Sequence, residues 1–365
     1  MRVLVLNAGS SSLKVSLVDE AGVQGEREFQ TAEGKIDEQQ LAATVRSLGD
    51  IDAIGHRVVH GGPRYSKSVR IDREVISYLV SITDLAPLHL PAALAGISAT
   101  REVLPRVAGV ACFDTAFHSR IPAAASTYAI PEEWRQRYAI RRYGFHGFSH
   151  AYASRRAAEM LGRSPHELRV VTCHLGAGAS LAAVRGGRSV DTTMGFTPLE
   201  GLVMATRSGS VDPGLLMWLQ RHAGIAEPEL SEALDRRGGL LALAGTADMR
   251  EVLKRIEAGD ERAELAFDVY VHRLRGLIAS MAAAMGGLDA LVFTGGVGEN
   301  APQVRAATVA GLRFLGLEIA TAQDASAGND VDISAAGARV PTLVVKARED
   351  IEVAREVRRV LSAPN

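Results

Sequence analysis

The chain has 365 residues, of which 47% are hydrophobic, and its formal net charge at pH 7 is −1. This length exceeds what one hydrophobic core usually serves, so we expect two domains. The near-zero charge argues against a nucleic-acid-binding surface and against a polybasic membrane-binding patch. We expect a cytoplasmic protein with no membrane-spanning helix. No run reaches about 18 consecutive apolar residues, and Met1 leads directly into a strand rather than a signal peptide.

Residues 1–18 predict a β-hairpin. Apolar strands at 3–6 and 13–18 flank a turn of Asn, Ala, Gly and Ser residues, and Lys14 lies at the start of the returning strand. Glycine lets the backbone approach a ligand, and hydroxyl, amide and ammonium groups favour a phosphate. A surface hairpin with a polar turn accounts for the same residues. From this segment alone both interpretations stay open.

The segments that follow alternate between helix and strand. Helices are expected at 36–48, 72–82 and 92–103. A strand that runs into a glycine turn is expected at 51–62, and another strand at 107–113. The alternation predicts an α/β fold. Arg57 falls near the end of the first of these strands, where α/β proteins place ligands, and Asp114 directly follows the second.

The second half of the chain repeats the pattern of the first hairpin. Residues 169–184 again combine a strand, a glycine-rich turn and a strand, which indicates two similar domains facing a shared cleft. Ahead of this repeat, residues 143–150 carry His146 and His150 and lead into a helix expected at 151–161, with Ser149 as its N-cap. The only two cysteines, Cys112 and Cys173, lie in strand-like runs and are expected to be buried thiols.

Three later segments complete the pattern. Residues 191–213 are long, irregular and rich in glycine, which is typical of functional loops, and they include Arg207. Residues 263–285 have the apolar period of a core helix. Residues 291–300 predict a strand that runs into Gly-Gly-x-Gly and a helix, a geometry that presents N–H groups to an anion but also occurs for packing reasons. A last helix at 351–361 is expected to pack on the first domain.

Taken together, these motifs resemble the acetate kinase family. The similar segments follow the order of that family along nearly the whole chain: LNAGSSSLK (6–14), GHRVVHGG (55–62), APLH (86–89), FDTAFH (113–118), RRYGFHG (141–147), HLG (174–176), TMGFTPLEGL (193–202), TRSG (206–209), DP (212–213) and FTGGVGEN (293–300). The resemblance implies the fold of actin and sugar kinases, with two duplicated ribonuclease H-like domains and the active site in the cleft between them. It implies domains at 1–116 and 117–348, a returning helix at 349–365, and a homodimer.

The implied reaction is reversible, direct in-line phosphoryl transfer from ATP to acetate, with Mg²⁺ or Mn²⁺ as cofactor. The family's catalytic residues match Arg57, Asp114, His146 and Arg207. A carboxylate nucleophile is already ionised at pH 7, so its attack needs no general base. We therefore favour for Asp114 a role in orienting Arg57 or a metal-bound water. The arginines are suited to bind the acetate carboxylate and the phosphoryl oxygens, because a guanidinium binds such groups through two N–H donors.

The resemblance also implies the remaining contacts. The metal is expected to bind Asn7 and Glu349, and the phosphates are expected to contact Ser10, Ser12 and Lys14. The acyl pocket draws on Arg57, Val59, Leu88, Phe145 and Pro198. The nucleotide is expected to contact His174, Leu175, Gly176, Ala177, Gly178, Asp248, Met249, Arg250, Gly296, Val297, Gly298, Glu299 and Asn300.

Four residues depart from the family's usual pattern: Leu90, Phe148, Ala177 and Ser210. Ala177 removes an amide from the nucleotide side, whereas Leu90 and Phe148 alter either the acyl side or packing alone. The catalytic set is intact, so we expect an active enzyme. Two alternatives stay open: a kinase that prefers propionate, butyrate or a phosphoryl donor other than ATP, and a nucleotide-binding scaffold without turnover.

Overall fold

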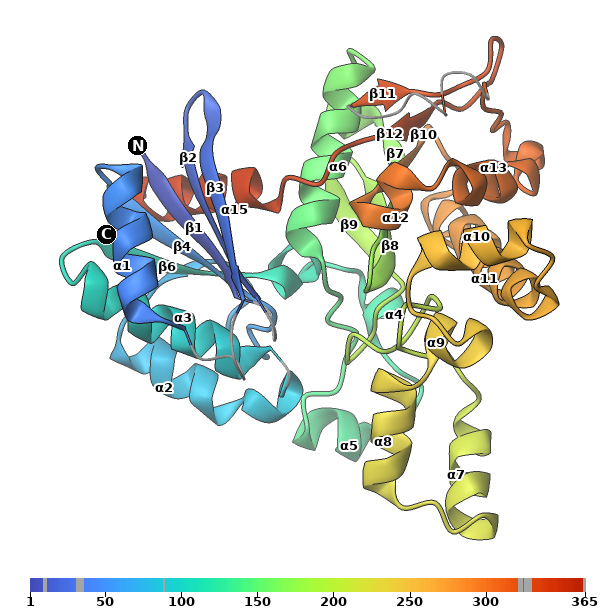
Figure 1. The fold of residues 1–365 in the computed structure, drawn as a ribbon, viewed down its shortest axis with the longest axis horizontal. Helices are drawn as coiled ribbons and strands as arrows, with labels where there is room; N and C mark the ends of the chain where they lie inside the picture. The colour runs from blue at the N-terminus through green and yellow to red at the C-terminus, as the bar shows by residue number, and fades with distance from the viewer. Residues whose placement is uncertain (9–11, 31–35, 88, 321–323, 325–329, 364–365) are drawn as a thin grey trace. The chain divides into compact units, whose positions relative to one another are not determined.

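The chain divides into two units, each built around one sheet (Figure 1). The first unit comprises Met1–Ser119, Phe145–Tyr152 and Arg348–Asn365, and the second comprises Arg120–Gly144 and Ala153–Ala347. The structure is a computed structural model that describes residues 1–8, 12–30, 36–87, 89–320, 324 and 330–363. Within these ranges, no helix is both long enough and apolar enough to cross a membrane.

The sheet of the first unit has the strand order β3-β2-β1-β4-β6-β5 across the described residues. β1 pairs antiparallel with β2 and parallel with β4, and β4 pairs parallel with β6. The predicted hairpin is therefore present as β1 and β2, and its turn at 9–11 lies outside the described residues. The strands are β1 Val3–Ala8, β2 Ser12–Asp19, β3 Gly22–Gln30, β4 Ala53–Val58, β5 Val69–Arg70 and β6 Ala108–Phe113.

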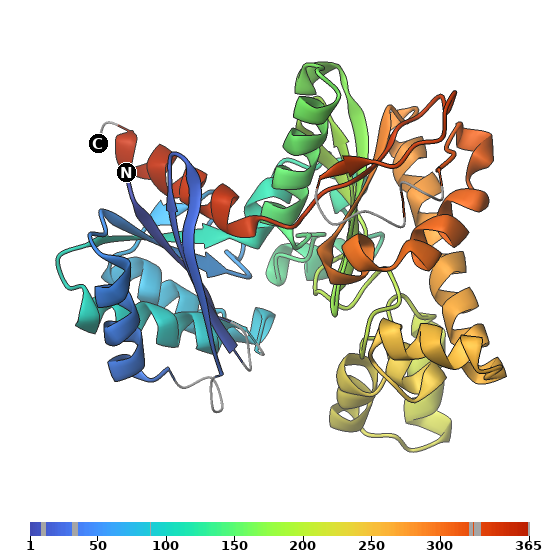
Figure 2. The same cartoon turned by 45° about the horizontal axis from the view of Figure 1, so that its top comes forward.

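Helices cover both faces of this sheet, as Figure 2 shows. The helices and 3-10 turns of the unit are α1 Glu38–Leu48, α2 Arg73–Ser81, η1 Thr83–Leu85, α3 Leu90–Val103, η2 Asp114–His118 and α15 Glu349–Ser362. Alternate residues of β1 serve the two faces, as a strand's period of two requires. Leu4 and Leu6 pack in one cluster with residues of α1 and α3, and Val3 and Val5 in another with residues of α15. The last helix thus packs on the first domain, as predicted.

The sheet of the second unit repeats the first. Its order over the described residues is β11-β12-β10-β7-β8-β9, so β7, β8 and β10 take the places of β1, β2 and β4. The fold is therefore α/β with two similar domains of the ribonuclease H type, as expected. The strands are β7 Arg169–Leu175, β8 Ala179–Arg185, β9 Arg188–Thr192, β10 Ala290–Thr294, β11 Val331–Asp332 and β12 Thr342–Val344.

The helices of the second unit include the predicted core helix, α11, which packs on β7, β8 and β9. Its buried side chains recur at a helical period, and Gly286 in the left-handed conformation follows its last residue. The helices and 3-10 turns are α4 Ala123–Ser126, α5 Glu132–Arg137, η3 Pro165–Glu167, α7 Pro213–His222, α8 Glu227–Arg236, α9 Gly239–Ala244, α10 Met249–Glu257, α11 Glu261–Met285, α12 Gly295–Asn300, α13 Pro302–Ala310 and η4 Arg313–Leu315.

Helix α6, Gly147–Met160, begins earlier than predicted. Ser149 was expected as the N-cap, but it lies inside the helix, and the amide of His150 already donates to the carbonyl of His146 (3.0 Å). Residues Phe145–Tyr152, which include the start of α6, belong to the first unit. Tertiary contacts within that unit therefore set where α6 begins. A division at residue 116 alone does not describe this grouping.

Candidate functional site

Three polar residues of the first unit surround the guanidinium of Arg57, and we call Asn7, Arg57, Asp114 and Glu349 the Arg57 cluster. Asn7 and Arg57 are register partners near the ends of β1 and β4, Asp114 follows β6, and Glu349 begins α15. Arg57 donates from Nε to Asp114 Oδ1 (3.1 Å), from Nη2 to Asp114 Oδ2, and from Nη1 to Asn7 Oδ1 (2.9 Å). Its Nε also lies 3.3 Å from Glu349 Oε2.

The cluster carries two carboxylates and one guanidinium, so its formal charge is −1. Asp114 is 1% exposed, and burial raises the pKa of its carboxyl to about 6, with Glu349 adding to the rise and Arg57 opposing it. Burial alone would lower the pKa of Arg57, but the charges of Asp114 and Glu349 and the hydrogen bonds of Asp114 raise it. Arg57 therefore remains charged, and the cluster has an excess of negative charge.

The donor set of the Arg57 cluster fits a magnesium ion. In the part of the chain that the structure describes, no group of three or more His, Cys, Asp and Glu side chains could hold a metal. Mg²⁺ does not require such a group, because it commonly binds one or two carboxylates and completes its shell with water and substrate phosphates. Asn7 and Glu349 supply an amide oxygen and a carboxylate beside a group with excess negative charge.

His146 is placed next to Asp114 by a close backbone contact. A Cβ on Gly147 would lie 2.0 Å from the carbonyl oxygen of Asp114, so only glycine fits there. His146 itself has φ +54°, a left-handed conformation that is uncommon for residues other than glycine. The carbonyl of Phe145 lies 3.0 Å from Nε2 of the buried His118, whose pKa burial lowers to about 4. The contacts of two adjacent residues therefore hold His146 in a strained backbone conformation.

The residues expected for the acyl pocket are only partly brought together. Val59 and Phe145 are buried in the first unit at 8% and 1% exposure, and the ring of Phe145 makes an edge contact with His60. Pro198 belongs to the second unit, and Leu88 lies outside the described residues.

The structure describes two of the three residues of the first hairpin that were expected to contact phosphate. Ser10 lies outside the described residues, and Ser12 is half-buried at the start of β2. Lys14 is exposed, and its ammonium lies 3.8 Å from Glu28 Oε2 on the neighbouring strand. Oppositely charged residues often pair in this way across neighbouring strands at a protein surface. The described contact of Lys14 is therefore accounted for without a phosphate.

A cavity of about 700 Å³ lies in the second unit where the two predicted glycine turns meet. Its volume is in the range of small-molecule sites. Most of the expected nucleotide residues line it, together with Arg207 and small or apolar side chains. The lining residues are Gly176, Ala177, Gly178, Ala205, Thr206, Arg207, Leu240, Ala247, Asp248, Met249, Arg250, Leu253, Tyr270, Gly296, Val297, Asn300 and Ala301.

The other expected nucleotide residues, His174, Leu175, Gly298 and Glu299, do not line the cavity. His174 and Leu175 belong to β7, and Gly298 is buried within α12. One oxygen of the Glu299 carboxylate, Oε1, accepts from the amides of Gly295 (3.0 Å) and Ala347 (2.8 Å). Glu299 thereby fixes the glycine turn and lies outside the cavity lining.

Three charged side chains line the cavity, those of Asp248, Arg250 and Arg207. Asp248 caps α10 and its carboxylate holds the guanidinium of Arg250, which is 89% exposed. Arg207 is 18% exposed, and its Nε lies 3.9 Å from Asp235 Oδ1. Burial lowers the pKa of Arg207, and the charge of Asp235 opposes that effect. These guanidinium groups and the backbone amides of the turns are suited to phosphate oxygens.

The departures from the family pattern have distinct surroundings. Phe148 is buried in the core cluster of the first unit that includes Val353 of α15, so it serves packing. Leu90 is fully buried at the start of α3. Ala177 lines the cavity, and its carbonyl accepts from the amide of Ala205 (3.1 Å).

Sequence reasoning missed Arg305, the largest fully buried side chain among the described residues. Arg305 donates to the carbonyls of Gly298 (2.7 Å) and Glu299 (2.9 Å) and pairs with Asp324. It therefore holds the end of the glycine turn. The only sequence signal was its position five residues after Asn300, which an exposed helical arginine would share.

Comparisons with known proteins agree on one family. The model of the acetokinase family matches residues 30–355. An acetate kinase from Synechococcus sp. is 46% identical over 404 residues and covers 99% of both chains. An acetate kinase from Streptomyces coelicolor is 45% identical over 99% of this chain and 97% of its own.

Solved structures lead to the same result. The crystal structure of an acetate kinase from Porphyromonas gingivalis matches with a TM-score of 0.90 and 36% identity, over 99% of this chain and 100% of that one. A propionate kinase from Francisella tularensis matches with a TM-score of 0.90 and 35% identity, over 98% and 99% of the two chains.

Proposed function

The chain belongs to the acetokinase family and is a phosphotransferase with a carboxyl group as acceptor, and on this premise we propose how its residues act. The proposed reaction converts ATP and acetate to ADP and acetyl phosphate, in either direction. The Arg57 cluster carries the proposal, because Asp114 and Asn7 use only three of the five N–H donors of Arg57 in the described structure. The remaining donors suit an anionic substrate.

The proposed chemistry is a direct in-line transfer. A carboxylate oxygen of acetate attacks the γ-phosphorus of ATP, the bond to the β–γ bridging oxygen breaks, and the electron pair leaves with ADP. No proton needs to move, so positioning and charge neutralisation supply the rate enhancement. Arg57 neutralises the acceptor and the transferring phosphoryl group, and His146 donates a hydrogen bond to the same oxygens.

Asp114 orients Arg57 in this proposal. Its two oxygens accept from Nε and Nη2, which fixes the plane of the guanidinium. Asn7 and Glu349 would hold Mg²⁺ or Mn²⁺, which neutralises charge on the phosphates when bound. Arg207 contacts the transferred phosphoryl group, and the cavity of the second unit takes the nucleotide. The proposed location is the cytoplasm, where ATP is available.

Acetate is proposed as the preferred acid, with propionate and butyrate as alternatives. The similarity to a propionate kinase keeps the longer acids open. To test the function, the protein is incubated with ATP, Mg²⁺ and acetate, propionate or butyrate, and acyl phosphate is trapped with hydroxylamine. We expect hydroxamate with acetate at the highest kcat/KM. Tight ADP binding without hydroxamate from any acid would instead support a nucleotide-binding scaffold.

A homodimer is proposed through α7. Three apolar side chains of this helix are strongly exposed, Leu215, Met217 and Trp218 at 45%, 49% and 55%, and no residue of α7 is buried. Apolar side chains that are exposed together on one helix are typical of an interaction surface. We expect light scattering to give twice the chain mass, and Trp218→Asp to halve it. Phe314→Asp, at a residue that is 69% exposed elsewhere in the unit, is the matched control and should leave the mass unchanged.

A further inference from the structure

Arg207 is carried by a loop whose two ends are tied together, and we call residues 201–210 the Arg207 loop. The amide of Gly201 donates to Ser210 Oγ (3.0 Å), and the amide of Ser210 donates to the carbonyl of Gly201 (3.0 Å). Farther along, the amide of Met204 donates to the carbonyl of Arg207 (3.1 Å). The amide of Ala205 also donates to the carbonyl of Ala177 (3.1 Å), and the amide of Ser208 to the carbonyl of Leu234 (2.9 Å). The base of the loop is therefore one of the anchors that set the position of the guanidinium.

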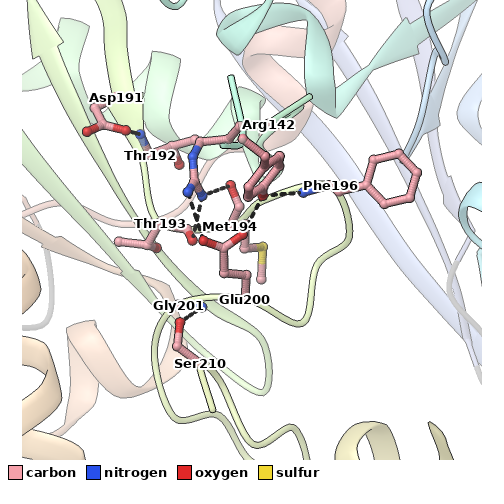
Figure 3. A network of polar contacts seen from close by, with 10 residues as sticks. Arg142, Asp191, Thr192, Thr193, Met194, Phe196, Glu200, Gly201 and Ser210 are labelled. Carbon is pink, nitrogen blue, oxygen red and sulfur yellow. Dashed lines mark hydrogen bonds and ion pairs between the residues drawn. The ribbon is translucent and has the colours of Figure 1, made fainter. Parts of the chain in front are cut away.

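The residue directly before the loop, Glu200, is held by an arginine from a distant part of the chain. Arg142 donates from Nη2 to Glu200 Oε1 (2.8 Å). From Nη1 it donates to the carbonyls of Thr193 (3.2 Å) and Met194 (3.1 Å). Figure 3 shows this guanidinium between the Glu200 carboxylate and the backbone that precedes it. Arg142 therefore ties both ends of the segment 193–200 to each other.

A tyrosine completes the arrangement. The hydroxyl of Tyr128 donates to Glu200 Oε2 and accepts from the amide of Phe196 (3.0 Å). Burial and the hydrogen bond to Glu200 raise the pKa of Tyr128, so the phenol keeps its proton and remains a donor. We call Tyr128, Arg142 and Glu200 the Arg142 network. Both carboxylate oxygens of Glu200 thus have partners.

The backbone is fitted closely around this network. A Cβ on Gly195 would lie 1.8 Å from Glu200 Oε2 and 2.1 Å from the Tyr128 hydroxyl oxygen, so any side chain there would displace both groups. Arg142 is 16% exposed and makes its bonds to three different acceptors. An ordinary surface ion pair has neither feature, and its contribution is small. The network fixes the chain immediately before the Arg207 loop.

We propose that Glu200, held by Arg142 and Tyr128, is a positioning residue for Arg207. The inference rests on the proposed role of Arg207 and deepens it. Glu200 does not itself line the cavity in the described structure, and it acts through the base of the loop. Its loss displaces the guanidinium without removing it, and a shift of about 1 Å at a reacting group can reduce a rate about 100-fold.

The first test replaces Glu200 and Tyr128 conservatively. Glu200→Gln should lower kcat about 100-fold and leave KM for ATP within about twofold. The reason is that the Gln side chain has one acceptor oxygen, whereas the Glu carboxylate accepts hydrogen bonds at two. Tyr128→Phe removes one hydroxyl and should lower kcat about tenfold while keeping the fold. Steady-state kinetics with acetate and ATP measure both, and thermal unfolding checks that each variant is folded.

The decisive test is a double-mutant cycle with Arg207→Ala. If Glu200 acts through Arg207, the double variant is as slow as Arg207→Ala alone, because residues that act as a unit are not additive. If the two losses multiply, the positioning role is refuted.

The matched control is Asp289→Asn. Arg169 binds Asp289 through Nε (2.8 Å) and Nη2 (3.0 Å) and also donates to the carbonyl of Gly286 (2.8 Å). This pair has the same kind of contacts, but it lies at the start of β7, whereas the glycine turn follows the end of that strand. Its loss should lower the unfolding temperature and leave kcat unchanged.

The outcomes separate the two proposals. Full activity of Arg207→Ala would refute the role proposed for Arg207 under the proposed function, and the positioning role with it. A slow Arg207→Ala together with a fully active Glu200→Gln would refute the positioning role alone. A slow Asp289→Asn would show that kcat follows general loss of stability, and would also overturn the inference.

Discussion

The two sheets share one strand order but present different chemistry where corresponding strands end. In the first unit, β1, β4 and β6 lead to the charged and amide side chains of the Arg57 cluster. In the second unit, β7 and β10 lead to glycine turns that line a cavity with backbone and small side chains. Arg57 on β4 and Thr294 on β10 occupy corresponding positions in the two sheets. Arg57 pairs in register with Asn7 on β1, and Thr294 pairs with His174 on β7.

This difference indicates that duplication supplied two frameworks and that residues at the strand ends specialised them. A carboxylate acceptor and a transferring phosphoryl group require concentrated, oriented charge, which side chains provide. A nucleotide requires room and amide donors, which glycine turns provide. We therefore assign turnover to the Arg57 cluster together with Arg207, and nucleotide affinity to the glycine turns.

The largest expected effect is that of Arg57→Ala, which removes the centre of the charged set. We expect kcat to fall about 1,000-fold, in the range found when an arginine that neutralises a transferring phosphoryl group is lost. The hydroxamate assay measures it. Arg64→Ala, which removes an arginine from an exposed pair with Glu74 in the same unit, is the control and should be fully active.

Asp114→Asn tests the orienting role. Asparagine has one acceptor oxygen in place of two, so the plane of Arg57 is no longer fixed, and we expect kcat to fall about 100-fold with KM for ATP nearly unchanged. A variant with normal kcat would contradict the orienting role. Steady-state kinetics at saturating acetate make the measurement.

The stability of the metal-free protein should also depend on Asp114. Its folded-state pKa of about 6 lies above the ordinary value of 3.8, so the folded chain binds more protons between these values. The contribution to the unfolding free energy is fully present below about pH 3.8 and is lost as the pH rises through about 6. Urea unfolding of wild type and Asp114→Asn at pH 5 and 7 should show the wild-type advantage shrinking at the higher pH. An advantage that grows would contradict the sign.

Gly296→Val should have the smallest effect, and it should change nucleotide binding rather than turnover. A Cβ at Gly296 meets nothing within 4 Å, and the residue lines the cavity, so a larger side chain enters the nucleotide space without disturbing the fold. We expect KM for ATP to rise about tenfold and kcat to change little, as when ground-state binding alone is lost. Gly276→Val on α11, where a Cβ also meets nothing within 4 Å, should leave KM unchanged.

Local patterns in the sequence predicted many of the strands and turns that build the two sheets. Short apolar runs on either side of glycine-rich turns identified β1, β2, β7 and β8, and glycine spacing identified the turn after β10. β3 was not predicted, because it is an edge strand with no buried side chain among those described, and so has no apolar run to detect.

What the sequence could not predict depends on distant contacts. Ser149 is a good N-cap by local preference, but the contact of Gly147 with the Asp114 backbone starts α6 earlier. The Arg142 network joins Glu200 to residues 58 and 72 positions away, and no local pattern reports such a pairing. Charge alone does not distinguish Arg305, buried beneath the glycine turn, from an exposed helical arginine.

The central claim, that the Arg57 cluster serves turnover and the glycine turns serve nucleotide affinity, is tested most directly by measuring kcat and ADP affinity in Arg57→Ala and Gly296→Val together. Calorimetric titration with ADP gives the Kd, and the hydroxamate assay gives kcat. We predict that Arg57→Ala loses turnover and keeps its Kd for ADP within about threefold, while Gly296→Val keeps turnover and binds ADP about tenfold more weakly. An Arg57→Ala variant that loses ADP binding in proportion to its turnover would contradict the account.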